Sequence, residues 1–265
     1  PGDGGKMYYF PLATGWWKYF SSRTNSFWCC DGTGAEEFSK FADSIYFRKG
    51  PALFVNLYIP SELRWPEQGL TLRQDTRFPA ADTARLQFTA ARPVRMAVNL
   101  RIPAWTAAGG SVAVNGRKLE AFANPGSYLT LERTWQSGDV IELRLPMALR
   151  AEPLKGDPSQ QAPMYGPLVL AARLGSDGLT TAMQYDPDSA PPNAVNGGTQ
   201  VAPRGRAEGA AAITLRFGEA AEAAGWVQQT GELEFTAAGA ELVPLHQILG
   251  ERYAVYWQVK RALRP

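Results

Sequence analysis

Residues 94–102 read VRMAVNLRI, and residues 127–135 read SYLTLERTW. In both stretches apolar and polar residues alternate, which puts the apolar set on one face of an extended chain. Turn residues such as Asn115-Gly116, a pair typical of tight hairpins, separate these stretches from their neighbours. Short strands at roughly ten-residue spacing predict an antiparallel β-sandwich. The other alternating stretches are residues 52–60, 69–78, 84–90, 111–119 and 139–150.

The pattern changes near Ser159. Residues 163–174 (PMYGPLVLAARL) are typical of a buried strand, whereas residues 176–210 lose their periodicity and fill with Gly, Pro, Ala, Asp and Asn. We expect a long irregular loop there and then a second, smaller β-domain. Its expected strands are residues 211–217, 232–236, 241–245 and 252–259.

Upstream of the strands lies SFWCCDGTGAEEFSK, residues 26–40. Thr33 and Glu36 have the spacing of a capping box, which predicts that a helix begins near Gly34 and continues towards Phe47. One apolar stripe at helical spacing runs along it. The stripe consists of Phe38, Phe41, Ala42 and Ile45.

Cys29 and Cys30 are the only cysteines in the chain. Three explanations remain open for an adjacent pair: small apolar residues in a core, a strained disulfide between neighbours, or a thiolate site for a metal or a nucleophile. The pair precedes the expected helix, and the partial positive charge of a helix N-terminus favours a thiolate.

Composition limits the remaining classes of function. The chain has 265 residues, of which 45% are hydrophobic and 20% charged, as in a globular protein. Its net charge is +2, no Lys/Arg block indicates nucleic-acid binding, and no apolar run is long enough to span a membrane. The opening Pro-Gly-Asp-Gly-Gly lacks an initiator methionine, so we expect a piece of a longer protein.

Several motifs together resemble glycoside hydrolase family 127 and its relative family 146, the β-L-arabinofuranosidases and similar proteins. The most specific is the Cys-Cys-x-Gly-Thr-Gly-x-Glu block at Cys29 to Glu36, and the resemblance extends from about Tyr8 to Trp257. The other motifs are NSFWCCDGTGAEEFSKFADSIYF as a whole, ALFVNLYIPSELRW, GLTLRQDTRFP, LRIPAW, VNG, PGSYLTLERTWQSGDVIELRLPM, YGPLVLAA and ELVPLHQILGERYAVYW.

The resemblance implies a mainly β chain: two β-sandwich-type domains preceded by the helical remnant of an (α/α)6 catalytic barrel. The remnant comprises residues 1–48, the first sandwich residues 49–158, and the smaller β-domain residues 159–265 with its loop at 176–210.

The resemblance also implies the chemistry of the cysteine pair. Cys29 corresponds to the nucleophile of a retaining mechanism, and Cys29 and Cys30 correspond to ligands of Zn²⁺. In the family a third cysteine, a glutamate ligand and the glutamate acid/base precede this pair. The 28 residues before Cys29 contain no Glu, Cys or His, so we expect this chain to lack the acid/base and most of the zinc site and not to retain zinc.

Other chemistry-bearing residues are better explained by structure. Glu36 and Glu37 are the nearest glutamates to the pair, and we interpret them as a cap and a solvated helix face. His246, the only histidine, lies among strand residues far along the chain, where we expect no metal or catalytic role. A dense aromatic run favours core packing over sugar stacking. Its members are Trp16, Trp17, Tyr19, Phe27 and Trp28.

The expected function is therefore that of the carboxy-terminal part of a retaining glycosidase acting on β-L-arabinofuranosides or related plant glycans. The alternative is a non-catalytic β-sandwich module that binds carbohydrate or serves as a scaffold. The expected partner is an L-arabinofuranose-containing oligosaccharide, with no nucleic acid or membrane partner, and a homodimer through the β-domains is left open. A periplasmic or secreted location is favoured over a cytoplasmic one.

Overall fold

A computed structural model of the chain describes residues 8–9, 12–20, 29–180, 184, 214–217 and 226–261. The chain divides into two compact units. We call Ser39–Ala148 the sandwich unit, and Pro1–Phe38 together with Leu149–Pro265 the C-terminal unit. The predicted mainly β fold is confirmed. The assignment of residues 1–48 to a barrel remnant stays a prediction.

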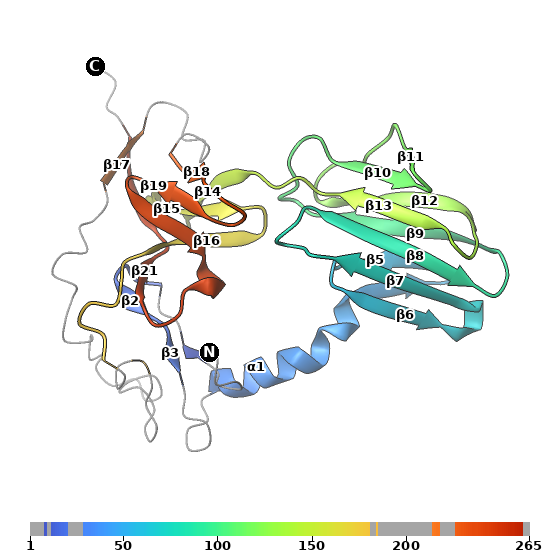
Figure 1. Ribbon diagram of the computed structural model, residues 1–265, viewed down its shortest axis with the longest axis horizontal. Coiled ribbons are helices and arrows are strands. Elements are labelled where there is room, and N and C mark those ends of the chain that lie inside the picture. Colours follow the sequence, from blue (N-terminus) through green and yellow to red (C-terminus); the bar gives the residue numbers. More distant parts are fainter. Residues whose placement is uncertain are drawn as a thin grey trace. The chain divides into compact units, whose positions relative to one another are not determined.

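The sandwich unit consists of a six-stranded and a four-stranded sheet that share one core (Figure 1). The six-stranded sheet has the order β11 (Arg117–Lys118), β10 (Ser111–Val114), β13 (Val140–Arg144), β8 (Thr83–Ala90), β7 (Leu70–Thr76) and β6 (Ser61–Trp65). The four-stranded sheet has the order β12 (Ser127–Trp135), β9 (Val94–Ile102), β5 (Ala52–Val55) and β4 (Tyr46–Lys49).

The two stretches with the clearest alternation form the longest ladder of this unit. β9 and β12 have the predicted bounds and pair antiparallel from Ser127 opposite Ile102 to Trp135 opposite Val94. Val98 and Leu100 of β9 face Leu86 and Phe88 of β8 in the shared core. The prediction of a fully antiparallel sandwich is wrong in one place, because β5 and β9 pair parallel. Three strands of the other sheet lie between them in sequence, and this crossover makes the parallel pairing feasible.

The Asn115-Gly116 signal is confirmed as the turn between β10 and β11. Both residues have positive φ, 53° and 76°, as a tight hairpin turn requires. The Asn115 amide donates to Asp139 Oδ1 at 2.7 Å, and its oxygen accepts from the Val140 amide at 2.8 Å. The buried Asp139 also accepts from the Gln136 amide at 2.9 Å. The turn asparagine therefore joins two turns of the same sheet.

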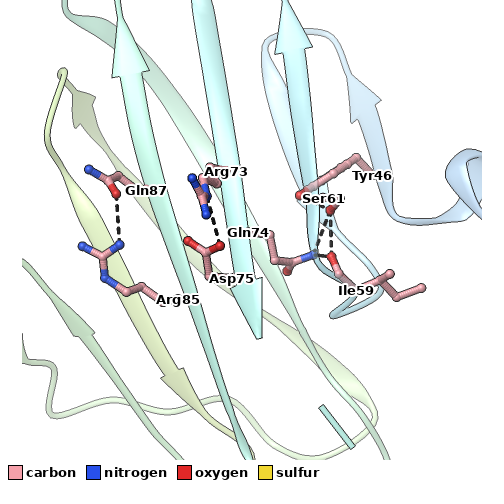
Figure 2. A network of polar contacts seen from close by, with 8 residues as sticks. All are labelled: Tyr46, Ile59, Ser61, Arg73, Gln74, Asp75, Arg85 and Gln87. Atoms are coloured by element: carbon pink, nitrogen blue, oxygen red, sulfur yellow. Dashed lines mark hydrogen bonds and ion pairs between the residues drawn. The ribbon is translucent and has the colours of Figure 1, made fainter. Parts of the chain in front are cut away.

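A polar network links the edge strands of the two sheets (Figure 2). The Tyr46 hydroxyl of β4 lies 3.0 Å from Ser61 Oγ of β6, and Ser61 donates its own hydrogen to the Ile59 carbonyl. The amide of the buried Gln74 donates to the carbonyls of Leu57 and Ile59 at 3.1 and 2.8 Å. Burial raises the pKa of Tyr46. Because Ser61 gives its hydrogen to Ile59, the Tyr46 hydroxyl is the donor to Ser61.

The C-terminal unit is built on one ten-stranded branched sheet. Its main path has the order β17 (Thr214–Phe217), β22 (Trp257–Arg261), β15 (Asp157–Tyr165), β16 (Leu168–Arg173), β20 (Ala240–Pro244), β19 (Phe235–Ala237) and β18 (Gln228–Gln229). Three further strands join this path: β14 (Leu149–Leu154) pairs with β15, β21 (Arg252–Ala254) with β16, and β2 (Trp16–Trp17) with β21. A separate pair joins β1 (Tyr8–Tyr9) to β3 (Tyr19–Phe20).

Strand β16 of this sheet is buried on both faces. Leu170 and Ala172 of β16 belong to one apolar cluster, whereas Ala171 between them belongs to a second. Alternate residues of a strand point to opposite faces, so the two clusters lie on opposite sides of the sheet. The buried strand predicted over residues 163–174 is in fact two strands, β15 and β16, because Gly166 turns the chain with a φ of 52°.

The helix at the cysteine pair begins earlier than predicted. α1 spans Cys29–Lys40 and is followed by the 3-10 helix η1 (Ala42–Ser44), so Thr33 and Glu36 lie inside the helix and do not form an N-terminal capping box. The same residue pattern can occur at the start of a helix or inside one, and only the backbone conformation distinguishes the two positions. Of the predicted apolar stripe, Ile45 is buried at 8% exposure, whereas Phe38 is 72% exposed.

Most of the predicted irregular loop at residues 176–210 lies outside the described residues. No helix in the described part of the chain is long and apolar enough to cross a bilayer.

Candidate functional site

The cysteine pair occupies the first turn of α1. Cys29 and Cys30 are its first two residues, so their backbone lies where the N–H groups of a helix lack partners within the helix. The positive end of the helix dipole lies at the same place and favours negative charge there. The backbone position therefore suits a thiolate, whether it serves as a nucleophile or as a metal ligand.

The nearest glutamates do not form an acid/base partner for the pair. Glu36 and Glu37 are exposed residues of the same helix. At 1.5 Å per residue, Glu36 lies about 10 Å from Cys29 along the helix axis. Retaining glycosidases hold their two reacting groups roughly 5 Å apart. The prediction that these two residues lie on an exposed helix face is confirmed. The prediction that Glu36 belongs to an N-terminal cap is wrong, because the helix begins at Cys29.

The described residues contain no group of three or more His, Cys, Asp or Glu side chains that could hold a metal ion. Two thiolates are suitable zinc ligands but supply only half of a tetrahedral set. A complete zinc site therefore needs ligands beyond those of the described residues, and we derive no chemical step through a metal from them.

The structure brings Lys18 and His246 together, although they are far apart in sequence. Lys18 is 2% exposed, and its ammonium group donates to the Leu245 carbonyl at 2.5 Å. Burial lowers the pKa of Lys18 to about 8. Burial, and then the charge of Lys18, lower the pKa of His246. A neighbouring ammonium group opposes the binding of a metal cation at His246.

Sequence reasoning did not identify this buried lysine. The only signal for it is its position inside the aromatic run WWKYF, residues 16–20. Trp17 is buried and carries the Arg252 guanidinium 4.9 Å from its ring centroid, which agrees with core packing for this residue. The side chains of Tyr19, Phe27 and Trp28 lie outside the described ones.

Comparison with known proteins identifies the class of the sandwich unit. Residues 52–147 match the family model described as "Beta-L-arabinofuranosidase, GH127 middle domain". The match covers nearly all of the sandwich unit and confirms the resemblance to family 127 for this part of the chain. The chain is therefore related to glycoside hydrolases. No curated protein matches the sequence.

Solved structures share the fold over most of the chain. A GH127 β-L-arabinofuranosidase from Geobacillus stearothermophilus T6 has 19% identity and a TM-score of 0.58, over 88% of this chain and 37% of its own. A glycoside hydrolase has 18% identity and a TM-score of 0.61, over 95% and 42%. A GH127 β-arabinofuranosidase has 20% identity and a TM-score of 0.63, over 97% and 43%. The chain thus spans about two fifths of the length of these structures.

Proposed function

We propose that this chain is the carboxy-terminal part of a retaining glycoside hydrolase that acts on β-L-arabinofuranosides or related plant glycans. The observation that carries the proposal is the match of residues 52–147 to the GH127 middle domain. The Cys29-Cys30 pair at the start of α1 and the fold similarity over 88–97% of the chain support it further.

In this proposal Cys29 is the nucleophile. Its thiolate forms a bond to the anomeric carbon while the bond from that carbon to the leaving oxygen breaks, and an acid outside this chain protonates that oxygen. Water then displaces the thiolate, the same acid/base takes the proton from the water, and the sugar leaves with its configuration retained. The first turn of α1 favours the charged form of the sulfur before attack and after release.

Cys30, with Cys29, would hold a Zn²⁺ ion whose other ligands lie outside this chain. When bound, zinc keeps the thiols deprotonated at neutral pH. The proposed partner is an oligosaccharide that contains L-arabinofuranose.

The experiment is to trap the covalent intermediate. The natural protein, with all residues that precede Pro1, is incubated with an activated β-L-arabinofuranoside, quenched in acid and digested for mass spectrometry. We expect one pentosyl group on the peptide that contains Cys29, attached at Cys29 and not at Cys30. Two results would contradict the proposal. One is a pentosyl group attached to a carboxylate side chain, and the other is a Cys29→Ser variant that remains active although its peptide carries no adduct.

A further inference from the structure

The hairpin turn between β10 and β11 contains a chemically labile pair of residues. Asn115 and Gly116 form this turn, and both are exposed. Asparagine is one of the residues that degrade with time and heat. A glycine after it has no Cβ to shield its backbone nitrogen, and a Cβ added at Gly116 would meet no atom within 4 Å. The Gly116 nitrogen is therefore sterically open to reaction with the asparagine side chain.

The reaction that this pair can undergo is deamidation through a cyclic imide. The Gly116 backbone nitrogen forms a bond to Asn115 Cγ while the bond from Cγ to Nδ2 breaks, and Nδ2 leaves as ammonia with the proton that the Gly116 nitrogen loses. Solvent water then adds to one of the two ring carbonyl carbons, and the bond from that carbon to the ring nitrogen breaks. Attack at Cγ leaves aspartate at position 115, and attack at the backbone carbonyl carbon leaves isoaspartate.

The fold holds the Asn115 side chain away from this reaction. Its amide nitrogen donates to Asp139 Oδ1 at 2.7 Å, and its oxygen accepts from the Val140 backbone amide at 2.8 Å. A carboxylate only accepts and a backbone amide only donates, so both ends of the carboxamide have a matching partner. The bond to the carboxylate is charge-assisted and therefore strong. Both partners lie at the start of β13, and the side chain has to leave them to reach the Gly116 nitrogen.

Asp139 depends on the same contact. It is 2% exposed, and its other contacts in the described part of the chain are the Gln136 backbone amide at 2.9 Å and an Arg133 guanidinium nitrogen at 3.8 Å. Deamidation replaces the donor at position 115 by a second carboxylate. Two carboxylates at this distance repel each other unless they share a proton, and a buried acceptor that loses its donor is costly.

The alternative is that exposure alone decides the rate, in which case the turn reacts like an unfolded peptide. The two hydrogen bonds argue against it, because they bind the very group that has to react. We therefore propose that Asn115 is a deamidation site whose reaction the folded chain slows through Asp139 and Val140. Once the reaction is complete, it breaks the link between the β10–β11 turn and the turn before β13.

The first test measures the rate in the whole 265-residue chain at mildly alkaline pH, folded in buffer. Cleavage after Arg101 and Arg117 at slightly acidic pH gives the peptide of residues 102–117, in which Asn115 is the only asparagine, and mass spectrometry measures the converted fraction against time. A synthetic peptide of residues 108–122 in the same buffer is the unfolded reference. We expect Asn115 to react at least about fivefold more slowly in the folded chain, because the reaction has to wait for local opening of the turn.

The second test asks whether Asp139 is responsible. Asp139→Asn keeps the size of the side chain but replaces the charge-assisted bond by a weaker one, so deamidation of Asn115 in the folded chain should accelerate about threefold or more. Asp75→Asn is the matched control, because Asp75 belongs to the same sheet and pairs with Arg73 at 3.0 Å far from the turn in sequence. Its rate at Asn115 should stay within about twofold of the unchanged chain.

The third test measures the consequence of the reaction with Asn115→Asp, which has the side chain of one product. Its urea midpoint should fall by at least about 0.5 M, because the donor to Asp139 is lost. Asn124→Asp adds the same charge at another exposed asparagine of the sandwich unit and should lower the midpoint by less than half as much.

Each test has a result that would overturn the inference. A rate in the folded chain within about fivefold of the peptide rate would show that the turn gives no protection. An unchanged rate in Asp139→Asn would show that the carboxylate does not slow the reaction. Equal midpoints for Asn115→Asp and Asn124→Asp would show that the product leaves the link between the two turns intact. The first test needs no substitution, so it decides the question even if Asp139→Asn does not fold.

Discussion

Trp135 offers the sharpest test of the sandwich core, and the substitution we consider is Trp135→Phe. The indole is 0% exposed and stacks on Phe88 with ring centroids 4.4 Å apart and an interplanar angle of 19°. Its Nε1 donates to the Met96 carbonyl at 3.2 Å. Phenylalanine keeps a ring against Phe88 but removes the donor and part of the buried ring system.

The expected loss of stability follows from these two terms. The hydrogen bond contributes about 1 kcal/mol. The missing part of the ring system corresponds to roughly two buried CH₂ groups, or about 1.5 kcal/mol. The free energy of unfolding of the sandwich unit should therefore fall by about 2.5 kcal/mol, and with a urea m-value of about 2 kcal/mol/M its midpoint should fall by about 1 M.

The assay follows methyl NMR signals of Val98 and Leu100 during urea unfolding, because two units need not unfold together. Trp105→Phe is the matched control: Trp105 belongs to the same unit, is only partly buried, and stacks on Phe78 at 5.4 Å. We expect its midpoint to change by less than half as much. If Trp135→Phe shifts the midpoint no more than Trp105→Phe, the assignment of Trp135 to the core is refuted.

Lys18→Met tests the buried ammonium group. Its pKa falls from 10.5 to about 8 on folding, so the unfolded chain binds more protons between these pH values, and the free energy of unfolding should rise with pH across that window by at most about 3 kcal/mol. Urea titrations from pH 7 to 10.5 should show this rise in the unchanged chain and not in the variant. Equal slopes of stability against pH in both proteins would contradict the expectation. Gly116→Ala should destabilise the sandwich unit by about 1–2 kcal/mol because φ is 76° there. Gly116→Asn should cost less, since asparagine tolerates that conformation. A lower urea midpoint for Gly116→Asn than for Gly116→Ala would contradict this prediction. The isolated 265-residue chain should hydrolyse no β-L-arabinofuranoside and should hold zinc weakly, with both thiols open to a thiol reagent under native conditions; turnover by the pure chain, or two inert thiols, would count against the proposed division of the active site.

The sequence predicts the sandwich well where local pattern and tertiary pairing agree. β9 and β12 alternate over their full length, and each is paired along its full length, so both ends follow from the pattern. The Asn115-Gly116 turn is equally local, because a two-residue hairpin needs positive φ at both positions. The parallel pairing of β5 with β9 is not local, and no pattern in either strand indicates it.

The start of α1 shows why other features escape the sequence. Thr33, Gly34 and Glu36 resemble the beginning of a helix, but the same residues also occur inside one when the preceding turn is already helical. Lys18 is buried because β2 pairs with β21, more than 230 positions away, and no local pattern indicates that contact. The hydrogen bond between Tyr46 of β4 and Ser61 of β6, which joins the edge strands of the two sheets, is likewise not local.

The role of the cysteine pair is a prediction from its motif, and the structure adds the position of the pair in the first turn of α1. The most direct measurement for the proposed function is the turnover of an aryl β-L-arabinofuranoside by the natural protein, including every residue that precedes Pro1, and by its Cys29→Ser and Cys30→Ser variants, with the zinc content measured in each. We predict that Cys29→Ser loses turnover by about 10⁴-fold or more, since an alcohol is a poor nucleophile at neutral pH, whereas Cys30→Ser mainly loses zinc and recovers partly when zinc is added. A Cys29→Ser variant that keeps turnover within about tenfold of the natural protein would contradict the assignment of Cys29 as the nucleophile.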